Sequence, residues 1–140
     1  MMKVIKNFDL DNITLDLSKE LNDAVDVIAL DIQRGIEKKR QFGKKFAKNA
    51  DSTIRKKGFD HPLYDTGLMF NADAMIKTKA TPVKQQATLS PNEKRIDIAF
   101  WNDSGTDTIP ARHFWGISQK AEKEILVRAV ARIHQILESA

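Results

Sequence analysis

The residues of this chain that could take part in catalysis are few and widely separated. The three histidines, His61, His113 and His134, do not recur at a metal-binding spacing. No Ser–His or Glu–His arrangement is visible from the spacing, and the chain has no cysteine to act as a nucleophile or a zinc ligand. The remaining candidate is Asp65 in Asp65-Thr66-Gly67, because one Asp from each of two subunits can share a proton in a dimeric site.

This tripeptide is typical of retroviral-type aspartic proteases, but its context here is different. Those enzymes place the Asp after a hydrophobic strand in a nearly all-β chain, whereas here it follows a short loop, residues 61–64, beside a basic segment. We therefore interpret Asp65-Thr66-Gly67 as a turn. Nothing in the sequence argues for a hydrolase built from scattered carboxylates. We expect no enzyme activity and no catalytic residue, cofactor or metal.

The composition is that of one ordinary globular domain, which we expect to span residues 1–140. Apolar residues make up 41% of the 140 residues and charged residues 30%, and the mean hydropathy is −0.42. No apolar run is long enough to cross a membrane, and the first residues lack the apolar core of a signal peptide. We expect no membrane association, and the lack of cysteine suits a reducing cytoplasm.

Charge is distributed unevenly along the chain. Residues 1–33 contain three Lys/Arg and seven Asp/Glu, a net charge of −4, whereas residues 34–57 contain ten Lys/Arg and two Asp/Glu, a net charge of +8. Three interpretations follow: a solvated face, a surface near DNA phosphates, or a surface that meets the acidic first helix of a neighbouring copy. The residues that we assign to this partner- or DNA-facing surface are Lys44, Lys45, Lys48, Arg55, Lys56 and Lys57.

Helical periodicity appears at both ends of the chain. Ser18 is the predicted cap of a helix with one apolar stripe from Leu21 to Ile36. Gly35 and Gly43 are expected to interrupt the basic segment that follows, which is either a broken helix or a mobile arm, and Gly58 to end it. Ser118 is the predicted cap of a final helix whose wide apolar face should cover a sheet.

The middle of the chain changes to a period of two, which predicts three strands near residues 68–76, 83–89 and 96–100. Thr81-Pro82 is a candidate connection between the first two strands. Residues 90–93 fit a type I turn that would pair the last two strands antiparallel. Residues 3–8 could add an edge. We therefore predict an α+β fold, with an antiparallel sheet of about three or four strands packed by an N-terminal and a C-terminal helix.

Two stretches resemble phage virion morphogenesis proteins, the family that includes tail completion and head-tail joining proteins. In that family a Pro-Ala-Arg, a bulky apolar pair, and then Gly and Ser lead into the last helix, as they do in residues 108–118 here. A Ser-Thr and a Lys-Gly precede a Leu-x-x-Thr-Gly segment that opens the strands, and residues 52–68 contain the same order. The resemblance covers roughly residues 46–118.

The resemblance implies a structural role, which directs attention to residues that could join subunits. Arg112 carries five donors that can clamp a carboxylate or a carbonyl, and large aromatic side chains are enriched at the energetic centres of interfaces. The alternative is that Arg112 binds a loop carbonyl within one chain and that Phe114 only packs the final helix. We expect the loop 102–109 to be exposed and flexible. The subunit-interface candidates are Trp101, Asp103, Thr106, Arg112, Phe114 and Trp115.

The resemblance implies a phage or prophage protein that completes the tail or joins it to the head. We expect a homo-oligomeric ring, with a hexamer as one candidate symmetry, in contact with other neck or tail proteins and near DNA in a channel. The expected location is the virion, with the host cytoplasm during assembly. If Arg112 acts between subunits, its reversal to Glu should leave the monomer folded but stop assembly. The alternative function is a basic nucleic-acid-binding accessory protein.

Overall fold

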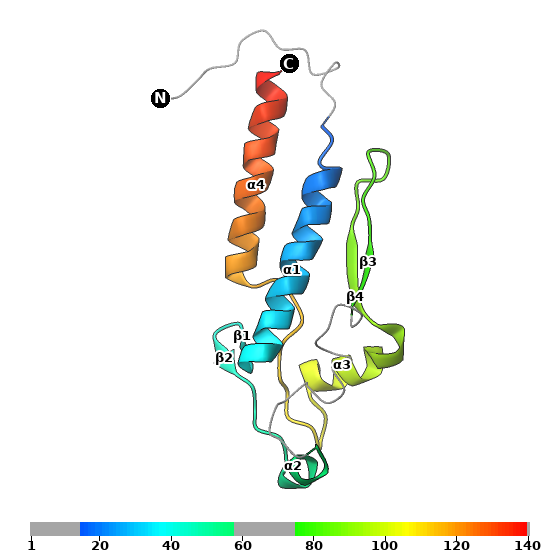
Figure 1. The fold of residues 1–140 in the computed structure, drawn as a ribbon, viewed down its shortest axis with the longest axis vertical. Helices are drawn as coiled ribbons and strands as arrows, with labels where there is room; N and C mark the ends of the chain where they lie inside the picture. Colours follow the sequence, from blue (N-terminus) through cyan, green and yellow to red (C-terminus); the bar gives the residue numbers. More distant parts are fainter. Residues whose placement is uncertain (1–14, 58–74, 140) are drawn as a thin grey trace.

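The computed structural model describes residues 15–57 and 75–139, which form an α+β fold (Figure 1). The predicted fold class is confirmed, but the described residues form two separate two-stranded antiparallel sheets and not one sheet of three or four strands. In chain order the elements are α1 (Ser18–Lys38), β1 (Arg40–Gln41), β2 (Lys44–Lys45), α2 (Asp51–Lys57), β3 (Met75–Thr78), β4 (Thr88–Pro91), a 3-10 helix η3 (Glu93–Arg95), α3 (Ile96–Ser104) and α4 (Gln119–Glu138).

The long helix α1 forms where the apolar stripe predicts it, with Val25, Ala29, Ile32 and Ile36 buried on one face. Its start differs from the prediction, because Ser18 is the first helical residue and not the cap. The Asp16 carboxylate Oδ1 accepts hydrogen bonds from the Ser18 backbone N–H at 3.0 Å and from its hydroxyl at 2.7 Å. These hydrogen bonds, the one from the hydroxyl above all, lower the pKa of Asp16.

Gly35 lies inside α1 and does not interrupt it, which corrects the sequence-based expectation. A Cβ at Gly35 would lie 2.5 Å from the Gln41 side-chain Oε1, so the absence of a side chain lets β1 approach the helix. The break comes at Lys39, which ends α1 in the left-handed conformation. Phe42 and Gly43, with φ of 51° and 76°, then form the two-residue turn between β1 and β2.

The hairpin of β3 and β4 is antiparallel, with Met75 opposite Pro91 and Thr78 opposite Thr88. Its connection contains Thr81-Pro82, as predicted, but the strand predicted from residue 83 starts only at Thr88. Residues 68–74 and 3–8 of the predicted sheet lie outside the described residues. Met75 is buried whereas Ile76 is exposed, so Met75 is on the side of β3 that faces the core.

The side chain of Asn22 joins the β3–β4 hairpin to α1. Its Nδ2 donates to the Ala80 carbonyl at 3.2 Å, and its Oδ1 accepts from the Ala80 N–H at 2.8 Å. One amide side chain therefore replaces a strand partner at the end of β3. An ion pair between Lys77 Nζ and Asp26 Oδ1, 2.8 Å apart, lies on the exposed side of the same contact.

The predicted strand at residues 96–100 is wrong, because this segment begins helix α3. The predicted turn at residues 90–93 is wrong as well, since Pro91 ends β4 and Asn92 starts the 3-10 helix by accepting from the Lys94 N–H at 3.0 Å. Five alternating residues satisfy a strand and a helix period almost equally. In the helix, Ala99 is the residue that faces the core.

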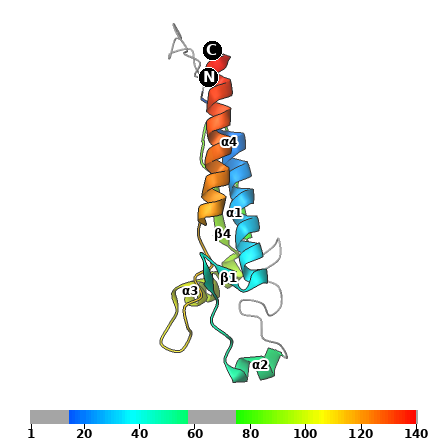
Figure 2. The ribbon, with the colours of Figure 1, turned by 90° about the vertical axis from the view of Figure 1, so that its left-hand side faces the viewer.

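Helix α1 occupies the middle of the molecule, with α4 on one side and the β3–β4 hairpin on the other (Figures 1 and 2). Ser118 caps α4 as predicted, because its hydroxyl accepts from the Ala121 N–H at 3.1 Å. The prediction that this helix covers the sheet is wrong, since its main packing partner is α1. No helix in the described ranges is both long and apolar enough to span a membrane.

Among the described residues, the hydrophobic core lies where α1, β3, α3 and the segment before α4 meet. Its buried residues are Ala29, Ile32, Ile36, Met75, Ala99 and Phe114. Three of these, Ile32, Ile36 and Phe114, are the largest fully buried side chains among the described residues. The core therefore depends on contacts between α1 and a residue almost eighty positions later in the chain.

We predict that Ile32→Ala lowers the free energy of unfolding by about 2–4 kcal/mol, because it leaves a cavity at a site with no exposed surface. Leu30→Ala is the matched control on the same helix, since Leu30 is 46% exposed and its truncation should cost less than about 1 kcal/mol. Chemical denaturation followed by circular dichroism measures both. Equal losses would mean that Ile32 is not at the centre of the core.

Candidate interaction site

The segment between α3 and α4 brings together four of the six predicted interface residues. Asp103 is in the last turn of α3. Arg112, Phe114 and Trp115 lie in the irregular segment that connects α3 to α4. We call residues 102–118 the junction. Trp101 precedes it, on the exposed side of α3, and Thr106 lies at its far turn.

The Asp103 carboxylate organises the junction. Its Oδ1 accepts from the backbone N–H groups of Phe114 at 2.9 Å and Trp115 at 3.0 Å, and lies 2.9 Å from Nδ1 of His113. Three consecutive residues are thus held by one oxygen atom, and the turn directs Phe114 into the core, where it is 1% exposed. Hydrogen bonds from backbone N–H groups to a charged carboxylate are stronger than those to a neutral acceptor.

Arg112 is buried and acts within the chain, with 6% of its surface exposed. Its Nε donates to the Ala47 carbonyl at 2.8 Å and its Nη2 to the Lys48 carbonyl at 3.1 Å, while Nη1 lies 3.3 Å from Asn102 Oδ1. The same Asn102 accepts the Arg112 backbone N–H through its carbonyl at 2.6 Å. This is the intramolecular alternative for Arg112, and the guanidinium ties the segment before α2 to the junction.

An aromatic contact attaches the β1–β2 turn to the junction. The rings of Phe42 and His113 are stacked, with centroids 4.5 Å apart and planes at 28°. Gly116 has a φ of 140°, and a Cβ there would lie 3.2 Å from the Phe42 ring. Neither His113 nor Phe42 was singled out as a site residue, because they lie 71 positions apart in the sequence and only the fold brings them together.

The loop that follows α3 contains a short hydrogen-bonded turn. The Thr106 hydroxyl accepts from the Ile109 N–H at 3.0 Å, and the Thr106 N–H donates to the Ile109 carbonyl at 2.8 Å. Residues 102–104, which were expected to belong to this loop, are the last turn of α3. Thr106 itself is exposed, so its side chain remains at the surface as an interface candidate.

The exposed aromatic residues lie on the outer side of α3. Trp101 is 46% exposed and Phe100 is 66% exposed, and Ile96 one turn earlier is 47% exposed. Sequence reasoning missed Phe100 as a surface residue because a strand at residues 96–100 would have turned it inward. A helical interpretation would have found it, since Ile96 and Phe100 are four positions apart. Trp115 is half-buried and packs against the core.

The basic residues of the predicted electrostatic surface gather at one end of the molecule. Lys44 and Lys45 form β2, Lys48 follows it, and Arg55 and Lys56 are in α2, all with exposed side chains. The side chain of Lys57 lies outside the described residues. The hairpin and α2 are on the same end of the fold as the C-terminus of α1 (Figure 1). This end of the protein therefore presents positive charge at its surface.

Across the described residues, no three His, Asp or Glu side chains gather in a way that could hold a metal ion. Comparison with protein-family models, with curated proteins and with solved structures finds no match to this chain.

We predict that Asp103→Ala lowers the free energy of unfolding by about 2 kcal/mol, because the N–H groups of Phe114 and Trp115 lose their acceptor. Asp107→Ala, an exposed position in the following loop, is the matched control and should change stability by less than about 0.5 kcal/mol. Thermal and chemical unfolding of the two variants provides the comparison. Equal stability of both variants would show that the junction does not depend on Asp103.

The burial of Arg112 changes the expectation for its reversal. Arg112→Glu removes the donors for the Ala47 and Lys48 carbonyls and buries a new charge, so the monomer itself should be destabilised, by about 3 kcal/mol. The same denaturation measurement tests this. A normally stable Arg112→Glu monomer would favour the earlier interpretation, in which Arg112 acts between subunits.

Proposed function

We propose that this chain is a structural subunit of a phage or prophage particle that completes the tail or joins it to the head as a ring of identical copies. The observation that carries the proposal is an imbalance of apolar surface. Among the described residues, nine apolar residues are buried, four of them alanine, whereas eleven large hydrophobic residues are exposed. Exposed apolar residues that adjoin one another are typical of a partner-binding surface. Such neighbours are Ile96 and Phe100 on α3, and Leu126, Val127 and Val130 on α4.

The resemblance of residues 46–118 to virion morphogenesis proteins supports the choice of partner. The junction, which contains one of the two stretches of that resemblance, is held by the hydrogen bonds of Asp103 and Arg112. A rigid junction presents the α3 side chains Phe100 and Trp101 in a defined direction, as a repeated subunit contact requires. We place the protein in the neck or tail of the virion, with other neck or tail proteins as its neighbours.

We expect purified particles to contain this chain at a fixed, small copy number relative to the major tail tube protein. Particles and tail intermediates from a phage-producing culture would be separated and quantified by mass spectrometry with isotope-labelled peptides. Presence in headless tails would assign the ring to the tail side, and absence from them to the head side. Absence from all particles would contradict the proposed structural role.

A second candidate function is binding of nucleic acid, and the cluster of exposed basic residues at one end of the molecule favours it. Lys44 and Lys45 on β2 and Arg55 and Lys56 on α2 are exposed. They belong to a stretch, residues 34–57, that holds ten basic and two acidic residues. Such a surface attracts phosphates by releasing counterions. In a ring the same surface would line a DNA channel.

For this second function we expect DNA affinity to fall steeply with salt, and Lys44→Glu with Lys45→Glu to reduce the slope of log affinity against log salt by about 2. Lys94→Glu, an exposed substitution on η3, is the control. Fluorescence anisotropy with labelled duplex DNA gives the slopes. Binding by the free subunit that persists at physiological salt would favour the nucleic-acid function, and its loss there would favour the ring.

A further inference from the structure

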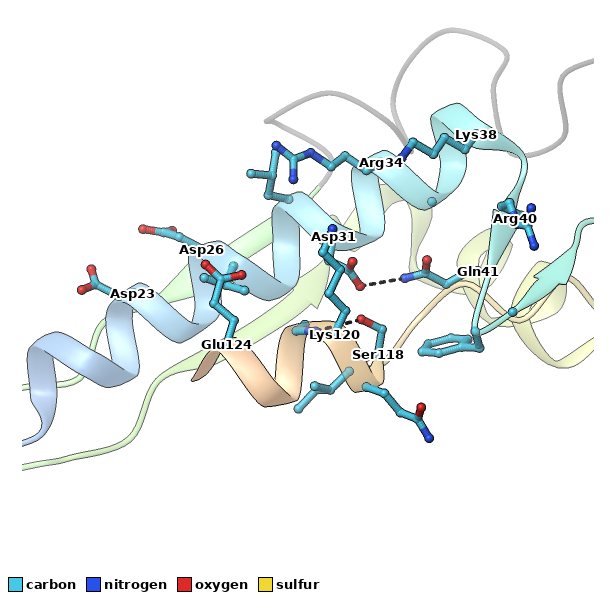
Figure 3. Close-up of a pocket in the computed structure, with 18 of the residues that line it drawn as sticks. Asp23, Asp26, Asp31, Arg34, Lys38, Arg40, Gln41, Ser118, Lys120 and Glu124 are labelled. Atoms are coloured by element: carbon cyan, nitrogen blue, oxygen red, sulfur yellow. Dashed lines mark hydrogen bonds between the residues drawn. The ribbon is translucent and has the colours of Figure 1, made fainter. Parts of the chain in front are cut away.

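A groove runs along α1, between this helix and the first turns of α4, and the β1–β2 hairpin closes one end (Figure 3). Its volume is about 1000 Å³. The α1 side of this groove presents residues at successive helical turns. We call the groove along these residues the α1 groove. The residues at these successive turns are Asp23, Val27, Leu30, Arg34 and Lys38. Asp26, Asp31 and Gly35 of α1 line the same groove, and Lys120, Glu124 and Arg128 line it from α4.

Charge changes sign along the α1 groove. Asp23 and Asp26 lie toward one end, and Lys38 and Arg40 toward the other (Figure 3). Asp26 is paired with Lys77, whereas Asp23 has no hydrogen-bond or ion-pair partner within residues 15–57 and 75–139. Between the two ends lie Val27 and Leu30, which is 46% exposed, beside Asp31, whose Oδ2 accepts a hydrogen bond from Gln41 Nε2. The groove therefore suits a helix that is basic at one end, apolar in the middle and acidic at the other end.

Helix α4 carries such a surface on the side turned away from α1. Arg132 Nε lies 3.6 Å from Glu20 Oε1 of α1 and marks the inner side of α4. Helical periodicity puts Val127 and Val130 on the opposite side, where they are 63% and 54% exposed. We call this surface the α4 ridge. Its members, in chain order, are Lys123, Val127, Val130, His134 and Glu138.

The two surfaces have the same spacing. Both present residues at relative positions 0, 4, 7, 11 and 15 of a helix, so each extends roughly 22 Å along its axis. Placed parallel, Lys123 of the ridge meets Asp23 of the groove, Val127 and Val130 meet Val27 and Leu30, and Glu138 meets Lys38. The remaining pair, His134 with Arg34, adds no attraction. In an antiparallel placement both ends would bring like charges together, which is unfavourable.

We propose that the α4 ridge of one copy docks, parallel to α1, in the α1 groove of a second copy of this chain. A second copy is the occupant because the order of charges on the ridge is the complement of the order in the groove. The ridge and the groove are different surfaces of one subunit, so the contact is heterologous and repeats from copy to copy, which closes into a ring or extends as a filament. This inference specifies the subunit contact of the proposed ring and rests on that proposed function.

The absence of cysteine from the chain permits a direct test by disulfide cross-linking of the full-length protein. The variant Asp23→Cys with Lys123→Cys should form a ladder of disulfide-linked dimers, trimers and larger species under mild oxidation, because facing positions of parallel helices come within disulfide reach. Non-reducing electrophoresis and intact mass measurement give the species. The control, Val83→Cys with Lys123→Cys, uses a residue that is 99% exposed on the β3–β4 loop and should give no ladder.

A second pair of variants tests the heterologous geometry. Val127→Glu blocks the ridge and Leu30→Glu blocks the groove, and each alone should weaken self-association about tenfold or more by light scattering. Mixing the two should restore one contact and give a one-to-one dimer, since one partner keeps its ridge and the other its groove. Val83→Glu is the matched control and should associate normally. Circular dichroism establishes that each variant is folded.

Three results would overturn the docking proposal: a monomeric oxidised double-cysteine variant, dimers from Lys123→Cys alone as efficient as the ladder, or no dimer in the mixture. The first result together with a fixed copy number in particles would reject this contact and leave the structural role intact. A ladder from a chain that is absent from all particles would support the contact and reject the role in the virion.

Discussion

The Asp103 carboxylate is the interaction on which the arrangement of the other elements depends. One oxygen atom holds the N–H groups of Phe114 and Trp115, and this turn delivers Phe114 to the core beside Ile32 and Ile36. Among the described residues, Phe114 is one of the three largest fully buried side chains, so its position matters for the packing of α1 against α3. The charge of the Asp103 carboxylate strengthens these two hydrogen bonds, and they add to the stability that comes from apolar burial.

Arg112 extends this constraint to a distant part of the chain. By donating to the carbonyls of Ala47 and Lys48, it fixes the segment that carries the basic residues relative to the junction. A buried guanidinium is stable only when its donors are satisfied, and here backbone carbonyls satisfy them within one subunit. The basic end of the molecule is thus attached to the same rigid centre as the exposed aromatic residues of α3.

The layout of the fold leaves apolar surface uncovered. Helix α1 lies between α4 and the β3–β4 hairpin, and each of these covers only one of its sides (Figures 1 and 2). Val127 and Val130 of α4 and Phe100 of α3 consequently remain exposed. Apolar side chains exposed on two helices are available for contact with further copies, which is the assembly proposed above. This links the fold directly to the proposed assembly.

The sequence alone determined the two long helices and the cap at Ser118, because helical periodicity sustained over many residues admits one interpretation. It could not decide residues 96–100, where five alternating residues fit a strand or a helix, and in the fold they begin α3 with Ala99 in the core. Nor could it find the partners of Arg112, since the Ala47 and Lys48 carbonyls lie 65 and 64 positions away. Helix periodicity and capping depend on residues that are close together in the chain, so the sequence can show them. The hydrogen-bond partners of Arg112 are brought together by the packing of distant segments, so only the tertiary structure decides them.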